Sequence, residues 1–406
     1  MKKDILWNSI GTSAWSFLSL ALLVVVTRIN GIEASGAFSF AFAFALIMYT
    51  VSSYGGRVYQ VSDQKNVFKN SSYLALRLFT SLAALFFTLL FIALNQYNLQ
   101  LSVLIVILVS QRIFDALADV FHGILQRNNQ LYVAGRSLFY KSFFSFVVFL
   151  ILDLSTKNLL LSASCLPLIS LLFLVLYDIP KSINIKNTSF KVTSSHIKTL
   201  FIATFLPFSI SALGLVFANL ARYFIELFHP ELQGYFGIII MPLSFVLLLF
   251  SFVTMPILVN LTKKYNSGEH YSIRQLIRRI VFLMTSITIV LCLATYAFAT
   301  PVLNILFGIN LSNYIFDIIL VVIIGYMLSV SSLFATIAII ARKLRFPVFV
   351  YLFSIVVLSI LCISLVQKFS IRGAVVSYAF ASIIQLLALG AYYLRITTNY
   401  KLSKKS

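Results

Sequence analysis

The sequence predicts an all-α polytopic membrane protein of about twelve transmembrane helices, in two six-helix bundles with both termini in the cytoplasm. Composition is the first reason. The chain of 406 residues is 60% hydrophobic and only 10% charged, with a mean hydropathy of +0.99, whereas a water-soluble chain needs charge over most of its surface. The second reason is that the apolar residues form runs of about eighteen or more, which cross a hydrocarbon core of roughly 30 Å.

The runs predict twelve spans along the chain. The first run follows Met1-Lys2-Lys3 as a signal sequence does, but it is too long for one and has no small-x-small cleavage site. We therefore interpret it as a retained helix. The fifth run is short and is expected to extend back towards Arg136. The expected spans are 7–27, 37–54, 72–94, 101–125, 138–152, 158–177, 199–224, 235–260, 278–300, 313–340, 348–366 and 373–394.

The distribution of lysine and arginine predicts the orientation. Alternate loops, counted from the N-terminal tail, hold 25 of the 31 cationic side chains, and the opposite loops hold only Arg28, Lys157, Lys368 and Arg372. This asymmetry would collapse if one helix had been miscounted, because every later loop would change sides. The positive-inside rule therefore places both tails in the cytoplasm. It also explains most of the net charge of +20, so no nucleic-acid partner is expected.

A basic polar stretch at about 178–198 divides the chain into halves of six spans each. The expected domains are 1–198, which includes this loop, and 199–406, which ends in a basic tail. The halves show a faint repeat, since Val-Thr-Arg at 26–28 and Leu-Ala-Arg at 220–222 each precede a Gly-x-Phe. Six spans are an even number, so such a duplication would be parallel. Paired six-helix bundles are a transporter architecture.

Motifs for soluble catalysis are missing from the sequence. The three cysteines, Cys165, Cys292 and Cys362, lie inside apolar runs without metal or redox spacing. There is no nucleotide-binding loop and no Gly-x-Ser-x-Gly elbow. We therefore expect a transporter that has no enzymatic activity and no cofactor, other than a coupling proton or sodium ion.

The fourth span carries the densest set of polar residues. Arg112, Asp115, Asp119, His122 and Gln126 recur at three- and four-residue steps, which places them on one stripe of a helix. Arg112 can pair with Asp115, and Asp119 can reach His122. One interpretation is a self-neutralising network that joins neighbouring helices. The other is a cavity wall in which Asp115, Asp119 and His122 bind the coupling ion, with Arg112 as a further contact for substrate.

The first span of each half ends at an arginine, Arg28 in the first half and Arg222 in the second. Arg28 and Arg222 can be snorkelling anchors at the outer leaflet. Arg222 follows Asn219 and precedes Glu226 by one turn, and a guanidinium suits a phosphate or pyrophosphate inside an apolar protein. Arg222, Asn219, Arg28 and Arg112 are therefore the candidates for contact with an anionic substrate.

Several segments resemble one known family. They are residues 15–17 (Trp-Ser-Phe), 26–40, 124–129, 219–225 and 234–236. Together they are similar to the bacterial polysaccharide (oligosaccharide-lipid) flippases, the O-antigen and capsule repeat-unit translocases of the multidrug/oligosaccharidyl-lipid/polysaccharide exporter superfamily. The resemblance implies two six-helix bundles around a cationic central cavity. It also implies that a polyprenyl-pyrophosphate-linked oligosaccharide is turned from the cytoplasmic to the outer leaflet by alternating access.

The physical interpretation agrees with this resemblance, and two alternatives stay open. A multidrug or small-metabolite antiporter of the same superfamily would favour acidic cavity residues. A membrane-embedded glycan polymerase or glycosyltransferase typically needs a large outer loop, whereas no outer loop here exceeds roughly a dozen residues. The expected partners are the lipid-linked oligosaccharide, membrane lipid, and a polymerase and chain-length regulator of the same pathway. The expected location is the bacterial inner or plasma membrane.

Overall fold

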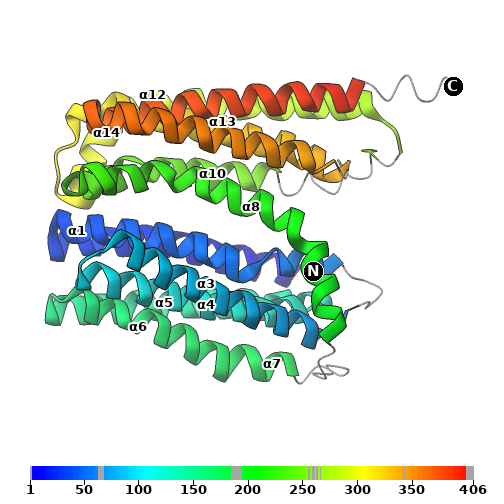
Figure 1. Ribbon diagram of the computed structural model, residues 1–406, viewed down its shortest axis with the longest axis horizontal. Helices are drawn as coiled ribbons and strands as arrows, with labels where there is room; N and C mark the ends of the chain where they lie inside the picture. The colour runs from blue at the N-terminus through cyan, green and yellow to red at the C-terminus, as the bar shows by residue number, and fades with distance from the viewer. Residues whose placement is uncertain are drawn as a thin grey trace. The chain divides into compact units, whose positions relative to one another are not determined.

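The structure is a computed structural model that describes residues 2–62, 68–183, 194–254, 257, 261, 264–265, 267–341 and 343–398. Over these residues the chain is built of helices and turns, with no β-strand (Figure 1). Ten of the described helical segments are long and apolar enough to cross a membrane. The expected all-α polytopic fold is confirmed, and the chain is a multi-pass membrane protein.

Two of these ten segments each contain two of the predicted spans. Helix α1 (Lys2–Ser53) is interrupted at Gly31, where φ is 89° and ψ is 178°. Helix α14 (Arg345–Thr398) is interrupted at Ser370, where φ is 49° and ψ is −123°. Both breaks fall between predicted spans, at 27–37 and 366–373. The described helices thus account for twelve apolar segments, as the sequence predicts.

The chain divides into two compact units, Met1–Leu215 and Val216–Ser406. In the N-terminal unit, α4 is the most buried span and lies against α1, α3, α5 and α6. The unit consists of α1, α2 (Gly56–Ser62), α3 (Asn70–Asn95), α4 (Leu99–Arg127), α5 (Leu131–Thr156), α6 (Leu159–Phe173), the π-helical turn η1 (Leu174–Asp178), α7 (Ile179–Ile183) and the first part of α8 (Ser194–Phe228).

In the C-terminal unit, α13 is the most buried span and lies against α10, α12 and α14. Its apolar core includes Phe250, Ile277, Met284 and Leu333. The unit consists of the rest of α8, η2 (Pro230–Leu232), α9 (Gln233–Ile239), α10 (Met241–Thr254), α12 (His270–Phe307), η3 (Ser312–Tyr314), α13 (Ile315–Ile340) and α14. Since α4 and α13 correspond to the fourth span of each half, the two units share one plan.

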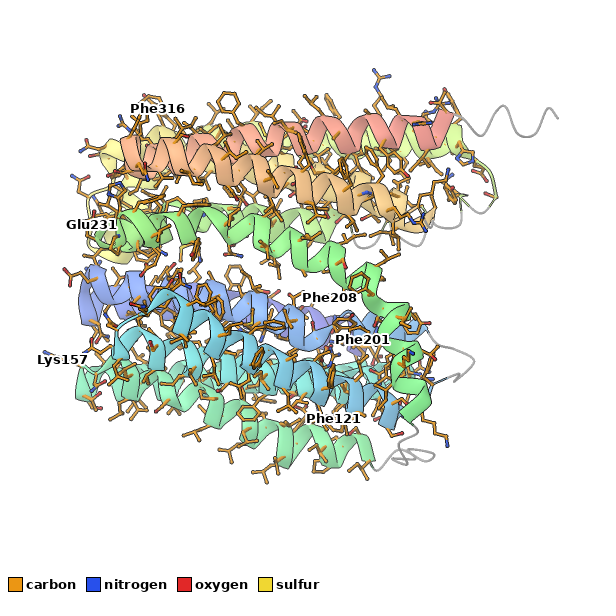
Figure 2. The ribbon with its side chains drawn as sticks, in the orientation of Figure 1. Phe121, Lys157, Phe201, Phe208, Glu231 and Phe316 are labelled. Carbon is orange, nitrogen blue, oxygen red and sulfur yellow. The ribbon has the colours of Figure 1, made fainter. Side chains whose placement is uncertain are left out.

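The division between the units falls inside α8, beyond the boundary predicted at 198/199. Aromatic packing explains its position. Tyr54 stacks on Phe201 and Phe208, with ring centroids 4.6 Å and 4.3 Å apart, and both phenylalanines project from the first part of α8 (Figure 2). This part of α8 therefore packs into the N-terminal unit.

Two predicted spans have different limits in the structure. Helix α5 begins at Leu131, so it extends back past Arg136 as expected. The predicted span 235–260 is divided at Ile240 between α9 and α10. Pro242 explains the division, because a residue without a backbone N–H fits only the first turn of a helix. Much of 255–260 lies outside the described residues.

Candidate functional site

Asp115 is the centre of a buried polar cluster in the N-terminal unit. Its carboxylate accepts from Arg112 Nη1 at 3.0 Å on its own helix and from Lys141 Nζ at 2.5 Å on α5. Trp15 Nε1 on α1 and Ser170 Oγ on α6 also donate to it, each at 3.2 Å. Donors from four helices thus meet at one carboxylate, and the expected Arg112–Asp115 pair is confirmed.

Arg112 is also held by aromatic rings. Its guanidinium lies 4.8 Å from the ring of Trp15 and 4.6 Å from the ring of Phe42, both on α1. A cation over an aromatic face is stabilised by the ring quadrupole, and more strongly where water is excluded. Arg112 is 2% exposed. Its orientation is therefore fixed by one carboxylate and two rings.

Asp119, one turn further along α4, lies between two arginines. Arg57 Nη1 on α2 donates to it at 3.0 Å and Arg77 Nη2 on α3 at 3.5 Å. Arg57 Nε also donates to Gln126 at 3.2 Å, and Arg77 Nη1 donates to the carbonyl of Ser52 at 3.3 Å. The stripe that the sequence predicts on α4 therefore faces cations from the neighbouring helices.

His122 takes a different partner from the expected one. Its Nε2 lies 3.1 Å from Asp178 Oδ1, at the end of the π-helical turn η1. Asp119 pairs with the two arginines, so the expected pairing of Asp119 with His122 is wrong. The π-helical turn adds a residue to the helical repeat, and it ends at the aspartate that meets His122.

We call Asp115, Asp119 and the four cations that pair with them the N-terminal charge cluster. In its ionised form the cluster has four cations and two carboxylates, so positive charge is in excess. A buried cation excess attracts an anion, because charge interactions are stronger where water is scarce. The members of the cluster are Arg57, Arg77, Arg112, Lys141, Asp115 and Asp119.

Sequence reasoning missed three of these members. Arg57, Arg77 and Lys141 were counted among the cations of the loops, yet Arg77 and Lys141 are each 3% exposed. A usable signal was the hydroxyl residues beside them, since Thr80 and Ser142 lie within one turn in otherwise apolar runs. Net charge alone could not separate a topological cation from a buried one.

The remaining candidates lie away from this cluster. Arg28 is exposed on α1, before the break at Gly31. Asn219 and Arg222 are half-buried on the part of α8 that belongs to the C-terminal unit, as is Glu226. Gln233 Nε2 donates to the carbonyl of Arg222 at 3.3 Å, which joins α8 to α9. The roles of Arg28, Asn219 and Arg222 in substrate contact stay predictions.

No family model matches the chain. Among curated proteins it is 25% identical over 385 residues to the capsular polysaccharide biosynthesis protein CapF of Staphylococcus aureus, covering 92% of this chain and 94% of that protein. Among solved structures it is similar to the lipid II flippase MurJ in an inward closed conformation, with a TM-score of 0.67 and 18% identity over 95% of this chain and 86% of that one.

It is also similar to an inward-facing multidrug resistance MATE family transporter of the MOP superfamily, with a TM-score of 0.72. The identity is 13%, over 97% of this chain and 99% of that one. The chain is thus a homologue of a bacterial capsular polysaccharide biosynthesis protein and has the fold of the MOP-superfamily transporters. The transporter fold that the sequence predicts is confirmed.

Proposed function

We propose that the protein is a flippase that moves a polyprenyl-pyrophosphate-linked oligosaccharide from the cytoplasmic to the outer leaflet by alternating access. The product would serve the synthesis of a cell-surface polysaccharide. The observation that carries the proposal is the cation excess of the N-terminal charge cluster, inside a bundle with a transporter fold. The name of the CapF relative supports a role in capsule-type glycan synthesis.

The chemistry of the headgroup fits this cluster. A pyrophosphate has several acceptor oxygens, and arginine binds such groups through two parallel hydrogen bonds. Arg57 is the most accessible member of the cluster, with its side chain 25% exposed. We infer that Arg57 contacts the pyrophosphate first. The more deeply buried Arg77, Arg112 and Lys141 contribute the positive electrostatic potential that attracts it.

The proposed direction rests on the positive-inside rule. If both tails are cytoplasmic, the cluster lies in the cytoplasmic half of the bundle, because Arg57 and Arg77 lie in the first half of helices that begin on that side and Lys141 lies before the middle of α5. An anionic headgroup entering from the cytoplasm would then meet this attractive field first. Arg222 with Asn219, and Arg28, are proposed as later contacts near the outer side.

For coupling, we propose Asp119 and His122 ahead of Asp115. Asp115 has four donors from four helices, and a carboxylate so strongly held is a poor site for a proton that must come and go. His122 and Asp178 form a pair that can share a proton. We further propose that a polymerase and a chain-length regulator receive the product.

A cation-coupled multidrug or small-metabolite antiporter is the second candidate, because the MATE family transporter has the same fold. An exporter of cationic compounds would need carboxylates in excess. The described charge cluster has the opposite balance, which favours the anionic substrate.

Proteoliposomes containing the purified protein test this choice. A polyprenyl-pyrophosphate oligosaccharide with a fluorophore on its sugar is placed in one leaflet, and an impermeant quencher reports its movement. We expect protein-dependent movement that Arg57→Gln slows and that Lys157→Gln, an exposed cation at the far end of α5, leaves unchanged. Transport of ethidium without movement of the oligosaccharide would instead establish the antiporter.

A further inference from the structure

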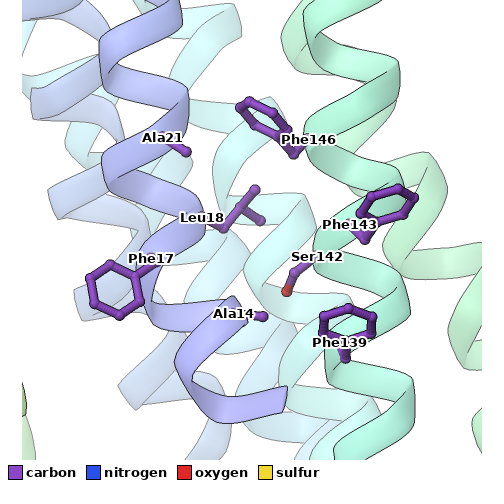
Figure 3. A pocket seen from close by; sticks show the side chains of 8 residues that line it. All are labelled: Ala14, Phe17, Leu18, Ala21, Phe139, Ser142, Phe143 and Phe146. Carbon is purple, nitrogen blue, oxygen red and sulfur yellow. The ribbon is translucent and has the colours of Figure 1, made fainter. Parts of the chain in front are cut away.

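A hollow lies between α1 and α5 in the N-terminal unit. The two helices run in the same direction and touch backbone to backbone, since a Cβ added to Gly11 would lie 2.1 Å from the carbonyl oxygen of Gly135. Beyond this contact the helices leave a cavity of about 190 Å³ (Figure 3). An apolar cavity of about 150 Å³ holds a benzene-sized group, so this one accepts a run of methylene groups. Its walls include Ala14, Phe17 and Leu18 on α1 and Phe139, Ser142 and Phe143 on α5.

The hollow opens on the lipid-facing surface of the unit. Phe17 and Phe143, on its opposite walls, are 43% and 52% exposed. Both belong to candidate membrane spans. A hydrocarbon chain of the bilayer can therefore enter from the side without passing any polar group.

One polar side chain lies in this apolar hollow. Ser142 is 4% exposed and projects between the two helices (Figure 3), and its Oγ has no hydrogen-bond partner among the described residues. A buried hydroxyl without a partner destabilises the folded protein. An acceptor on a bound molecule would remove that cost.

Cations and aromatic rings lie at the end of the hollow nearer the N-terminus. Arg136, about one turn before Phe139 on α5, places its guanidinium 4.8 Å from the ring of Trp7 and 5.6 Å from that of Tyr132. Its Nε is buried without a hydrogen-bond partner among the described residues. Lys3 Nζ lies 4.3 Å from the Tyr132 ring. Two cations among amphipathic rings are typical of a phosphate headgroup site at a membrane interface.

We propose that this hollow, with the cations at its end, binds an anionic glycerophospholipid of the bilayer. Its phosphate contacts Arg136 and Lys3, an ester carbonyl accepts from Ser142, and an acyl chain fills the hollow between α1 and α5. Asp4, on the same turn of α1 as Lys3, accepts from the backbone N–H of Tyr132 at 3.2 Å.

The spacing along α5 fits this occupant. Arg136 lies about 9 Å of helix before Ser142. The order of the two groups fits, because the phosphate of a glycerophospholipid precedes its ester groups on the way into the bilayer, and the long side chain of Arg136 can reach towards Ser142. Ser142 also decides between two lipids. A polyprenyl chain has no acceptor beyond its phosphates, whereas a glycerophospholipid offers ester carbonyls at the depth of Ser142. The site is therefore assigned to a membrane lipid and does not depend on the proposed transport of a glycan.

Native mass spectrometry of the purified protein with phosphatidylglycerol or phosphatidylcholine tests the headgroup contact. We expect the wild-type protein to retain phosphatidylglycerol in preference to phosphatidylcholine. Arg136→Gln should lower the amount of retained phosphatidylglycerol about fivefold. Lys157→Gln, at the opposite end of α5, is the matched control and should bind as the wild type does. Equal retention of both lipids by the wild type, or unchanged retention by Arg136→Gln, would overturn the proposal.

The ester contact has its own test. Ser142→Ala should weaken the binding of ester-linked phosphatidylglycerol about fivefold. It should leave the weaker binding of the ether-linked analogue unchanged. Ala14→Leu fills the hollow and should weaken the binding of both lipids. Ala297→Leu, at an exposed position of α12, is the control and should weaken the binding of neither lipid. Equal effects of Ser142→Ala on the two lipids would refute the ester contact. Displacement of phosphatidylglycerol by an equal concentration of polyprenyl phosphate would assign the hollow to the substrate tail instead.

Discussion

Helices α4 and α13 occupy the same central position in their own units but carry different side chains. Helix α4 carries Arg112, Asp115, Asp119 and His122 along one stripe, and each of them is buried and paired. Helix α13 has a single charged residue, Asp317, near its start. The rest of its buried face is apolar or hydroxylic, and its packing partners form an apolar core.

The difference shows that one helical plan can be stabilised in two ways. In the N-terminal unit, ion pairs connect α4 to its neighbours and leave positive charge in excess. In the C-terminal unit, side-chain packing connects α13 to its neighbours, with local hydrogen bonds such as Thr285 to Tyr326 at 2.8 Å. Among the described residues, buried charge is thus concentrated in the N-terminal unit, and substrate recognition through charge is expected there.

The largest effect is expected at Asp115. Asp115→Leu leaves Arg112 and Lys141 buried without a carboxylate, which costs about 3–5 kcal/mol. We expect a large fall in the temperature of unfolding in detergent and little protein in the membrane. If the variant is as stable as the wild type, ion pairs do not stabilise the N-terminal unit, and the contrast with α13 fails.

The breaks in α1 and α14 differ in a similar way. Gly31 has a φ of 89° and a ψ of 178°, a region that is essentially restricted to glycine. Gly31→Ala should therefore destabilise the N-terminal unit by about 1–3 kcal/mol, as measured by thermal unfolding. Ser370→Gly, at the other break, relaxes a positive φ and should be neutral or stabilising. A harmless Gly31→Ala would mean that the break can move.

Asp119→Asn separates the coupling role from the structural one. The amide keeps an oxygen that accepts from Arg57, but it cannot take up and release a coupling proton as a carboxylate can. We expect glycan export to fall about tenfold or more, with protein abundance in the membrane near normal. Loss of the protein from the membrane would identify Asp119 as structural and would remove it from the coupling proposal.

Arg222→Lys tests whether the C-terminal unit also contacts the anion. Lysine keeps the charge but loses the planar fork of the guanidinium. We expect export to fall about fivefold, with a larger fall for Arg222→Ala and accumulation of lipid-linked repeat units. Normal export by Arg222→Lys would support the anchor interpretation and would confine anion recognition to the N-terminal unit.

The smallest effect is expected at Asp317. Its partner Arg372 lies 3.6 Å away, but the arginine side chain is 66% exposed. An ion pair so open to solvent contributes about 0–1 kcal/mol. Asp317→Asn should therefore change the unfolding temperature little, in contrast to Asp115→Leu. An equally large effect at both positions would abolish the distinction between α4 and α13.

The sequence predicted the fold well because membrane spans depend on hydrophobicity and length, which are local properties. All twelve segments are present, and the breaks near Gly31 and Ser370 fall where polar residues interrupt the apolar runs. The limits of helices were less predictable. The first part of α8 joins the N-terminal unit through Tyr54, Phe201 and Phe208, and such a contact between distant segments leaves no trace in hydropathy.

The site was only partly predictable. The spacing of Arg112 and Asp115 determined their pairing, because both lie on one helix at a three-residue step. The partners of Asp119 and His122 come from α2, α3 and η1, so their identity depends on tertiary packing. A cation counted for topology can still be buried, as Lys141 is, because the positive-inside rule concerns the side of the membrane and not the depth of the side chain.

The three-residue step between Arg112 and Asp115 has a consequence for how the protein is made. The other ligands of Asp115 include Lys141 and Ser170, which leave the ribosome only after α4 has done so. An isolated charge at the centre of a helix costs about 2.5–3.5 kcal/mol to insert into the bilayer. Because Arg112 and Asp115 already neutralise each other within one turn, α4 can enter the lipid before α5 and α6 exist. Lys141 and Ser170 then add their contacts to an intrahelical pair that has already formed and that persists in the folded protein.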